Sequence, residues 1–318
     1  MSMEMRKAFA ETLGSLMRQD PRILIVNADL STPDGTYSLQ EEFGERMFNV
    51  GVQEANMASF AAGLASYGFI PAITTFAAFA SRRIFDQVAI SIAYAKRNVK
   101  IIGTDPGITA ELNGGTHMSL EDAGLMRALP GMLVFEPCDS TQLQKALPEL
   151  IMMDGPVYIR MSRKIYPDIF GVDYVYRRGI ADKLRDGADV TLFASGLEVK
   201  PALEAAEMLS PKGIDAEVIN IHTWKPIDRE TVISSVRKTR CAVTCENHSI
   251  INGLGSAVAE TTSEVFPVPV LRIGAQDRFG EVGKMDYLLK ALELTAEDIA
   301  RKAEEAVGIK HEVSGRTY

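Results

Sequence analysis

Two residues stand out for the chemistry that their surroundings would allow, a glutamate and a histidine. Glu54 is the only charged residue between Arg46 and Arg82, and it opens a helix-like segment without charge. A carboxylate at this place can simply favour the start of a helix. In apolar surroundings its ionised form is disfavoured, so it can also act as a proton donor or a hydrogen-bonding acid. The sequence leaves both interpretations of Glu54 open.

His117 differs from the other histidines in its local sequence. It ends the glycine-rich segment 113–117 (NGGTH), which follows an expected strand at 99–103. Loops of this kind commonly carry functional groups. His222 and His248 also follow expected strands, but no set of partner residues surrounds them in the sequence. We interpret these two as structural or subunit-contact residues.

Generic catalytic and metal-binding motifs are absent from the sequence. It contains no P-loop, GxSxG or HExxH pattern. Cys241 and Cys245 point to the same face of an expected strand without a second ligand pair nearby, so we interpret them as core thiols. The pair Gly253 and Gly255 lacks the third glycine of a dinucleotide fingerprint and predicts a closely packed turn. We therefore expect no metal site in this chain.

Composition narrows the class of protein. The chain has 318 residues, of which 46% are hydrophobic, and a net charge of −8, which suggests about two domains at roughly 150 residues each. No block of like charge predicts a nucleic-acid partner. The three cysteines cannot form a disulfide framework, and the first residues lack the apolar core of a signal peptide, so we expect a cytoplasmic protein.

One uncharged stretch, residues 57–81, is long enough on paper to span a bilayer. It contains Gly63, Gly68 and Pro71, and its periodicity changes partway through. A buried helix, a turn and a buried strand explain this pattern better than a membrane segment does. We expect no contact with a membrane.

Helical and strand patterns alternate along the chain, and these elements must position Glu54 and His117. Such alternation predicts two consecutive parallel-sheet α/β domains, at 1–166 and 188–318, joined by a linker at 167–187 where the periodicity dissolves. The expected helices include 4–18, 54–65, 77–94, 120–128 and 140–150, with one capped by Thr295 near the C-terminus. The expected strands are 22–27, 69–75, 99–103, 133–135, 157–160, 190–194, 216–221, 241–245 and 268–273.

Several short runs of the sequence match a known family. They are 48–57 (FNVGVQEANM), 61–65 (AAGLA), 75–79 (TFAAF), 114–117 (GGTH), 195–200 (SGLEVK), 225–228 (KPID) and 277–283 (DRFGEVG). Through these runs the sequence resembles the thiamine-diphosphate enzymes of the transketolase family. The resemblance covers nearly the whole chain in order, first to the family's pyrimidine-binding domain and then to its C-terminal domain.

The resemblance reaches only part of a full-length enzyme. Such enzymes begin with a diphosphate-binding domain bearing a GDG…NN metal motif, and no GDG occurs here. This implies the C-terminal subunit of a split transketolase, which moves a two-carbon ketol unit from a ketose to an aldose through a carbanion of thiamine diphosphate. A separate subunit would supply the diphosphate and Mg²⁺ site, and the expected assembly is α2β2.

The resemblance also implies roles for individual residues in cofactor binding. Glu54 matches the glutamate that hydrogen-bonds the aminopyrimidine ring of the cofactor and favours its imino tautomer. Phe79 matches the aromatic residue that stacks on this ring, and Phe76 matches the apolar wall beside it. His117 matches the histidine that contacts the oxygens of the donor sugar.

The residues that match the sugar-reading part of the family's site are less regular. Arg163 and Arg6 match arginines that bind substrate phosphate. The family usually has histidine where Asp105 falls, aspartate where Asn113 falls, and an aromatic residue near Arg82. These changes alter charge and hydrogen bonding. We therefore expect an unusual sugar substrate. It is phosphorylated or carries another anionic group, and the sequence does not require that this group is a phosphate.

Three alternatives to ketol transfer stay open. A pyruvate-dependent reaction like that of deoxyxylulose-phosphate synthase shares the glutamate and the loop histidine. The beta subunit of a 2-oxo acid dehydrogenase has a similar domain order, but its histidine-centred loop is not evident. A non-catalytic paralogue that binds only a partner is the third, and the joint presence of Glu54, Phe79 and His117 argues against it.

Overall fold

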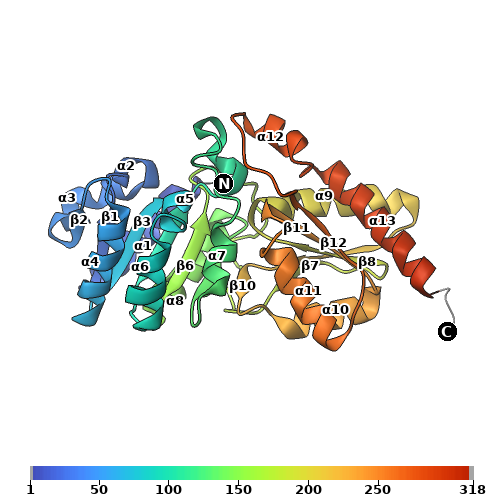
Figure 1. Ribbon diagram of the computed structural model, residues 1–318, viewed down its shortest axis with the longest axis horizontal. Helices are drawn as coiled ribbons and strands as arrows, with labels where there is room; N and C mark the ends of the chain where they lie inside the picture. The colour runs from blue at the N-terminus through green and yellow to red at the C-terminus, as the bar shows by residue number, and fades with distance from the viewer. Residues whose placement is uncertain (1–2, 315–318) are drawn as a thin grey trace.

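The computed structural model describes residues 3–314, which form two α/β units side by side along the long axis of the molecule (Figure 1). Within these residues, one sheet has seven strands in the order β10-β5-β6-β4-β3-β1-β2, and the other has five in the order β12-β11-β8-β9-β7. Helices cover both faces of each sheet, as the alternating pattern predicts. The α/β class and the two successive sheets are confirmed.

The first sheet is parallel except at one edge. Its parallel strands are β1 (Ile23–Asn27), β2 (Met47–Asn49), β3 (Ile70–Phe76), β4 (Lys100–Thr104), β5 (Leu133–Phe135) and β6 (Val157–Met161). The edge strand β10 (Thr223–Lys225) comes from the second half of the chain and pairs antiparallel with β5. The sheet is thus mostly parallel, as predicted, with one antiparallel edge strand that the second half of the chain supplies.

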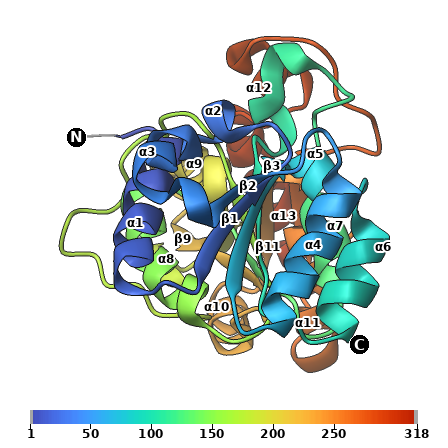
Figure 2. The ribbon, with the colours of Figure 1, turned by 90° about the vertical axis from the view of Figure 1, so that its left-hand side faces the viewer.

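Helices pack on the two faces of the first sheet as Figure 2 shows, with α1 and α8 on one face and α4, α6 and α7 on the other. Their inner residues and the strands between them form buried apolar clusters. The helices of this unit are α1 (Met5–Gln19), α2 (Ser31–Asp34), α3 (Gln40–Phe43), α4 (Glu54–Ser66), α5 (Ala77–Ala80), α6 (Phe85–Gln87), α7 (Asp122–Ala128) and α8 (Ser140–Met152), with the π-helix η3 (Val88–Tyr94) and the 3₁₀ segments η1 (Thr36–Leu39), η2 (Gly44–Arg46) and η4 (Gly107–Asn113).

The single long helix expected over 77–94 is broken. The Ser81 hydroxyl donates to the carbonyl of Ala77 at 2.6 Å, and the backbone of Ser81 leaves the helical region with φ −114° and ψ −88°. This hydroxyl competes with the regular helix ladder, as serine commonly does. The chain then turns before α6 begins, which places Arg82 and Arg83 in the turn.

The second sheet is also mixed. Its parallel strands are β8 (Val190–Ala194), β9 (Ala216–Asn220), β11 (Ala242–Ser249) and β12 (Val270–Ala275), while β7 (Asp182–Arg185) runs antiparallel to β9 at the edge. The strand β7 lies in the stretch expected to be a linker. Its half-buried residues give it too little hydrophobic patterning to be recognised from the sequence.

The helices of the second unit include a capped C-terminal helix, as expected. The hydroxyl of Thr295 accepts from the Asp298 N–H at 3.3 Å, and the Asp298 carboxylate accepts from the Thr295 N–H at 3.2 Å, which is a reciprocal capping arrangement. The helices are α9 (Val199–Leu209), α10 (Arg229–Thr239), α11 (Leu254–Val265), α12 (Met285–Ala291) and α13 (Ala296–Ser314), with the 3₁₀ turns η5 (Gly196–Glu198) and η6 (Ser210–Lys212).

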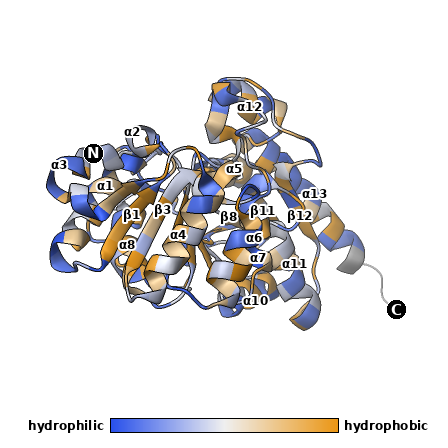
Figure 3. Cartoon of the chain, turned by 60° about the vertical axis from the view of Figure 1, so that its left-hand side comes forward, coloured by the Kyte–Doolittle hydropathy of each residue, from blue (hydrophilic) through white to orange (hydrophobic). Residues whose placement is uncertain are grey.

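One apolar cluster runs through both units. It joins residues of α4 and α7 to residues of α10 and α11 across Trp224, the middle residue of β10, whose side chain is buried. The domain boundaries predicted at residues 166 and 188 stay a prediction, although this apolar cluster contains residues from both sides of them. In Figure 3 the interior strand β1 carries hydrophobic colours while the outer helix α3 is largely hydrophilic. Within residues 3–314, no helix combines the length and apolarity that crossing a bilayer requires.

Candidate active site

The predicted cofactor and sugar residues gather at one end of the first sheet, where its parallel strands finish. Phe76 is the last residue of β3, and Phe79 lies in α5 directly after it. Asp105 follows β4 and Arg163 follows β6, while Glu54 opens α4. This is the end at which α2 and α5 lie in Figure 2. Ligands of open α/β sheets bind at the carboxyl ends of the strands, so the location suits a binding site.

Glu54 is buried and paired with a cation that the local sequence does not reveal. Its side chain is 3% exposed, and Arg83, 29 positions later, donates from Nη1 to its Oε1 at 2.6 Å. The same guanidinium lies over the ring of Phe79, with its carbon 3.7 Å from the ring centroid. The surroundings of Glu54 are thus less apolar than the charge-free sequence around it predicts, because the break after α5 brings Arg83 to it.

The loop histidine joins the two phenylalanines. The ring centroid of His117 lies 5.0 Å from that of Phe79 and 5.8 Å from that of Phe76, with both contacts edge to face. The two phenylalanine rings are 6.0 Å apart. The hydroxyl of Thr116 and Nδ1 of His117 are 2.9 Å apart. Residues that are far apart in sequence therefore form one aromatic cluster beside Glu54.

Asp105 and Arg163 extend this cluster. The Arg163 N–H donates to Asp105 Oδ1 at 2.9 Å, and its guanidinium forms an ion pair with Oδ2. The Arg163 guanidinium carbon lies 4.9 Å from the centroid of the Phe76 ring. Burial raises the pKa of the Asp105 carboxyl, and the charge of Arg163 opposes this rise. The structure thus ties the predicted sugar-reading aspartate to the predicted anion-binding arginine.

The remaining two predicted residues are placed less centrally. Arg6, in α1, donates to Glu4 at 2.8 Å, and the carboxylates of Glu4 and Asp105 both raise its pKa. Asn113 ends η4 and is exposed. Within the part of the chain that the structure describes, no hydrogen bond joins Asn113 to the cluster.

Asp34 is a buried carboxyl near the candidate site that the sequence analysis did not single out. It lies in α2, and its Oδ1 accepts from the hydroxyl of Thr104 at 3.0 Å. Burial raises the pKa of Asp34 to about 6, and it interacts electrostatically with both Asp105 and Arg163. In the sequence, its position after the first strand could have indicated it. The signal for Arg83 was weaker, since only a break in the expected helix directs its side chain back to Glu54.

The second unit holds the loop that follows β4. The Asn247 amide donates to the carbonyl of Pro106 at 3.1 Å and accepts from the Ile108 N–H at 2.9 Å. Between these two residues Gly107 has φ 54°, and a Cβ there would clash with Asn247. The fold therefore needs glycine at 107, and Asn247 fixes the segment that connects Asp105 to η4.

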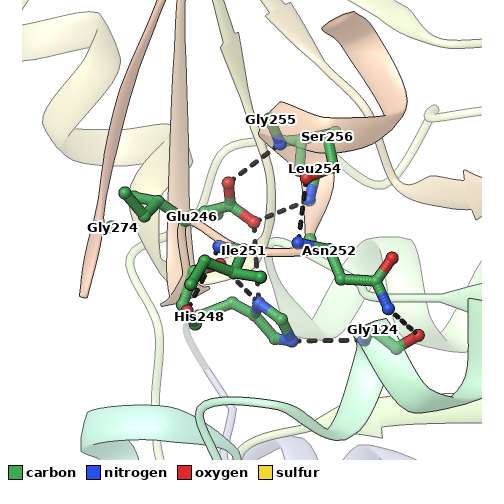
Figure 4. A network of polar contacts seen from close by, with 12 residues as sticks. Gly124, Glu246, His248, Ile251, Asn252, Leu254, Gly255, Ser256 and Gly274 are labelled. Carbon is green, nitrogen blue, oxygen red and sulfur yellow. Dashed lines mark hydrogen bonds and ion pairs between the residues drawn. The ribbon is translucent and has the colours of Figure 1, made fainter. Parts of the chain in front are cut away.

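The neighbouring residues of β11 form a second polar network, drawn in Figure 4. The Glu246 carboxylate accepts from the N–H groups of Leu254 at 2.6 Å and Gly255 at 2.8 Å. His248 Nε2 accepts from the Gly124 N–H at 3.2 Å, and burial lowers the pKa of His248 to about 4. A neutral His248 thus links the second unit to α7, consistent with a structural interpretation.

Two interpretations that concern packing can be compared with the described residues. A Cβ at Gly253 would clash with the Glu246 carboxylate, which agrees with the closely packed turn predicted there. The three cysteines are buried free thiols. Among residues 3–314, no group of three or more histidine, cysteine or acidic side chains has the arrangement of a metal site.

Comparisons with known proteins place the whole chain in one family. Residues 1–168 match the transketolase pyrimidine-binding domain, and residues 179–299 match the transketolase C-terminal domain. A 6-deoxy-6-sulfo-D-fructose transketolase subunit from Clostridium sp. (strain MSTE9) is 49% identical over 96% of this chain and 95% of its own length. One of the subunits of an apulose-4-phosphate transketolase from Phocaeicola vulgatus is 35% identical, over 95% of this chain and 97% of its own.

A solved structure agrees with these sequence matches. It is described as a split-gene transketolase in an inactive β4 tetramer, and it superposes with a TM-score of 0.89 at 41% identity, covering 98% of this chain and 100% of that one. The agreement extends over both α/β units. The chain therefore belongs to the transketolase family, as a split-transketolase subunit made of the pyrimidine-binding and C-terminal domains.

Proposed function

We propose that this chain, with a diphosphate-binding partner subunit, forms a thiamine-diphosphate-dependent transketolase that transfers a two-carbon ketol unit from a ketose to an aldose. One observation carries the proposal. Glu54 and Phe79 together hold a single planar nitrogen group, the guanidinium of Arg83, by a hydrogen bond at one edge and a stacked ring on one face. An aminopyrimidine ring needs the same two contacts, so the residues present fit the cofactor.

When bound, thiamine diphosphate supplies the electron sink that lets the bond beside the donor carbonyl break. Glu54 would hold a proton at the edge of the pyrimidine ring, and its burial keeps water from competing for that hydrogen bond. Phe79 would fix the plane of the ring. His117 would bind the oxygens of the donor, oriented by its packing against both phenylalanines.

An exposed apolar surface supports a partner subunit next to this site. Exposed aromatic and aliphatic side chains come from α4, from the residue that follows it, and from η3, which packs against α4. In Figure 2, α4 and α6 lie on the same face of the sheet. Exposed apolar side chains on neighbouring elements are typical of interaction sites. The residues are Phe60, Tyr67, Ile90 and Tyr94.

We place the diphosphate and Mg²⁺ ligands on the partner, since this chain lacks the GDG motif, and propose an α2β2 assembly. We also propose that the enzyme works in the cytoplasm, where its three free thiols would stay reduced. The ketose donor would carry a polar or anionic far end, as the names of the two relatives suggest for those proteins.

The test is reconstitution with the partner chain, thiamine diphosphate and Mg²⁺, followed by a panel of ketose donors and aldose acceptors. Ketol transfer that requires both subunits supports the proposal, and the Glu54→Gln variant should lose it. Glu42→Gln is a matched control, because Glu42 also pairs with an arginine, Arg18, on an exposed surface. Release of CO₂ from pyruvate in place of ketol transfer would establish one of the pyruvate-using alternatives. A complex without any turnover would establish a non-catalytic subunit.

A further inference from the structure

The sugar-reading end of the site contains basic side chains that are already neutralised by carboxylates. The start of α1 lies against the segment after β6, with the Met5 N–H donating to the Lys164 carbonyl at 3.1 Å. This brings basic groups from both segments to the same place. The ion pairs are Arg163 with Asp105, Arg6 with Glu4, and Lys164 with Glu111.

Asp105 is the most firmly held of these carboxylates. It is 1% exposed and receives both the backbone N–H and the guanidinium of Arg163, whose own side chain is 21% exposed. Asp105 also has φ 50°, a conformation that aspartate and asparagine tolerate better than most residues. A second buried carboxyl, that of Asp34, lies close enough to interact with it electrostatically. A ligand that reaches Arg163 therefore meets a cation whose charge is already balanced.

Resting on the ketol transfer proposed above, we propose that Asp105 is a specificity-determining residue of the site. It selects donors whose far end carries one negative charge or none, and it disfavours phosphate dianions. A phosphate monoester carries about −1.5 to −2 at neutral pH. To use Arg163 fully, it must displace Asp105 and leave a buried carboxylate without its partner, which is costly. A sulfonate has the same tetrahedral shape but a single charge, so it encounters less repulsion.

The experiment compares two donors that differ in this group, fructose 6-phosphate and 6-deoxy-6-sulfofructose, with the reconstituted two-subunit enzyme and one aldose acceptor. We expect kcat/KM for the sulfonate to exceed that for the phosphate by about tenfold or more. Asp105→Asn keeps the shape and the backbone conformation while removing the charge. It should reduce this preference about tenfold, mainly by lowering KM for the phosphate.

A matched control removes the same charge elsewhere. Asp20 pairs with Arg22 at an exposed position, with Arg22 Nη2 donating to Asp20 Oδ2 at 2.6 Å. Asp20→Asn should therefore leave the ratio of the two kcat/KM values unchanged. If Asp105→Asn does not assemble with the partner, Asp105→His, which restores the residue usual in the family, replaces it in the same comparison.

The outcomes separate this proposal from the function on which it rests. A wild-type enzyme that uses fructose 6-phosphate as well as the sulfonate overturns the role of Asp105 while ketol transfer stands. A preference that persists unchanged in Asp105→Asn or Asp105→His overturns it as well. Failure to transfer ketol units from either of these donors or from unsubstituted fructose counts instead against the proposed function.

Discussion

Replacing Arg83 with methionine should tighten the binding of thiamine diphosphate. In the structure, the guanidinium of Arg83 occupies both contacts that we propose for the pyrimidine ring, the Glu54 carboxylate and the Phe79 ring. It must leave when the cofactor binds. The free energy of breaking its two contacts is therefore subtracted from the binding free energy of the cofactor.

The size of this effect follows from the exposure of the group. Arg83 is 44% exposed, so solvent screens its ion pair with Glu54 and the pair contributes about 1 kcal/mol or less. The cation–π contact with Phe79 adds about 0.5–1 kcal/mol. Their sum is about 1.5 kcal/mol, which corresponds to roughly tenfold tighter binding of the cofactor in Arg83→Met.

Isothermal titration calorimetry of the cofactor-free complex of both subunits measures this affinity directly. Arg82→Met is the matched control, because Arg82 pairs with Glu121 at 3.1 Å and donates to the Thr116 carbonyl at 2.6 Å, away from Glu54. Loss of a cation near an anionic cofactor should weaken binding slightly in this control. If Arg83→Met binds no tighter than the wild type, or weakens in the same way as Arg82→Met, the reasoning is wrong.

Three further predictions concern other parts of the site. Glu54→Gln should lower kcat by about a hundredfold or more, since it removes the proton-holding group, yet sedimentation should show unchanged subunit assembly; near-normal rates would contradict its role. Asn247→Ala should raise KM for the donor and destabilise the fold by about 1–3 kcal/mol, because Pro106 and Ile108 lose their partners. Asn247→Asp, which keeps only the acceptor, should be intermediate, and an unchanged KM in both variants counts against positioning by Asn247. The pKa of Asp34 is raised to about 6 in the fold, so its stabilising contribution is complete below its unfolded pKa and is lost as pH rises through 6. Asp34→Asn should therefore gain about 1.5 kcal/mol of stability over the wild type between pH 5 and pH 8 in urea unfolding, since the rest of the effect falls below pH 5; a constant difference across this range contradicts the shift.

The strands and helices predicted from apolar runs were largely found, because burial on both faces of a parallel sheet leaves a strong local pattern. The strand β1, for example, is buried at all five positions, Ile23–Asn27. The elements that were missed lack such a pattern. β10 is a three-residue strand, Thr223–Lys225, whose partner strand lies in the other unit. The local periodicity of a sequence cannot reveal a pairing between strands that lie so far apart along the chain.

The candidate site shows the same limit. Glu54 and His117 are recognisable because their local sequences are unusual. Arg83 is not, because its contact with Glu54 depends on the helix break at Ser81. An alanine-rich run favours an unbroken helix by propensity, so tertiary geometry decides the outcome here. The role given to Asn113 stays a prediction.

The contacts of Asn247 give the second unit a part in the site, since its amide holds Gly107, two residues after Asp105. Glu54 and Phe79, in contrast, are positioned by α4 and α5 of the first unit. The loop after Asp105 thus depends on the second unit, while the contacts of Glu54 and Phe79 do not. The separation is partial, because Arg163, which pairs with Asp105, also lies near the ring of Phe76. A substitution at Asp105 can then change the charge that the sugar meets while Glu54 and Phe79 keep their supports in α4 and α5.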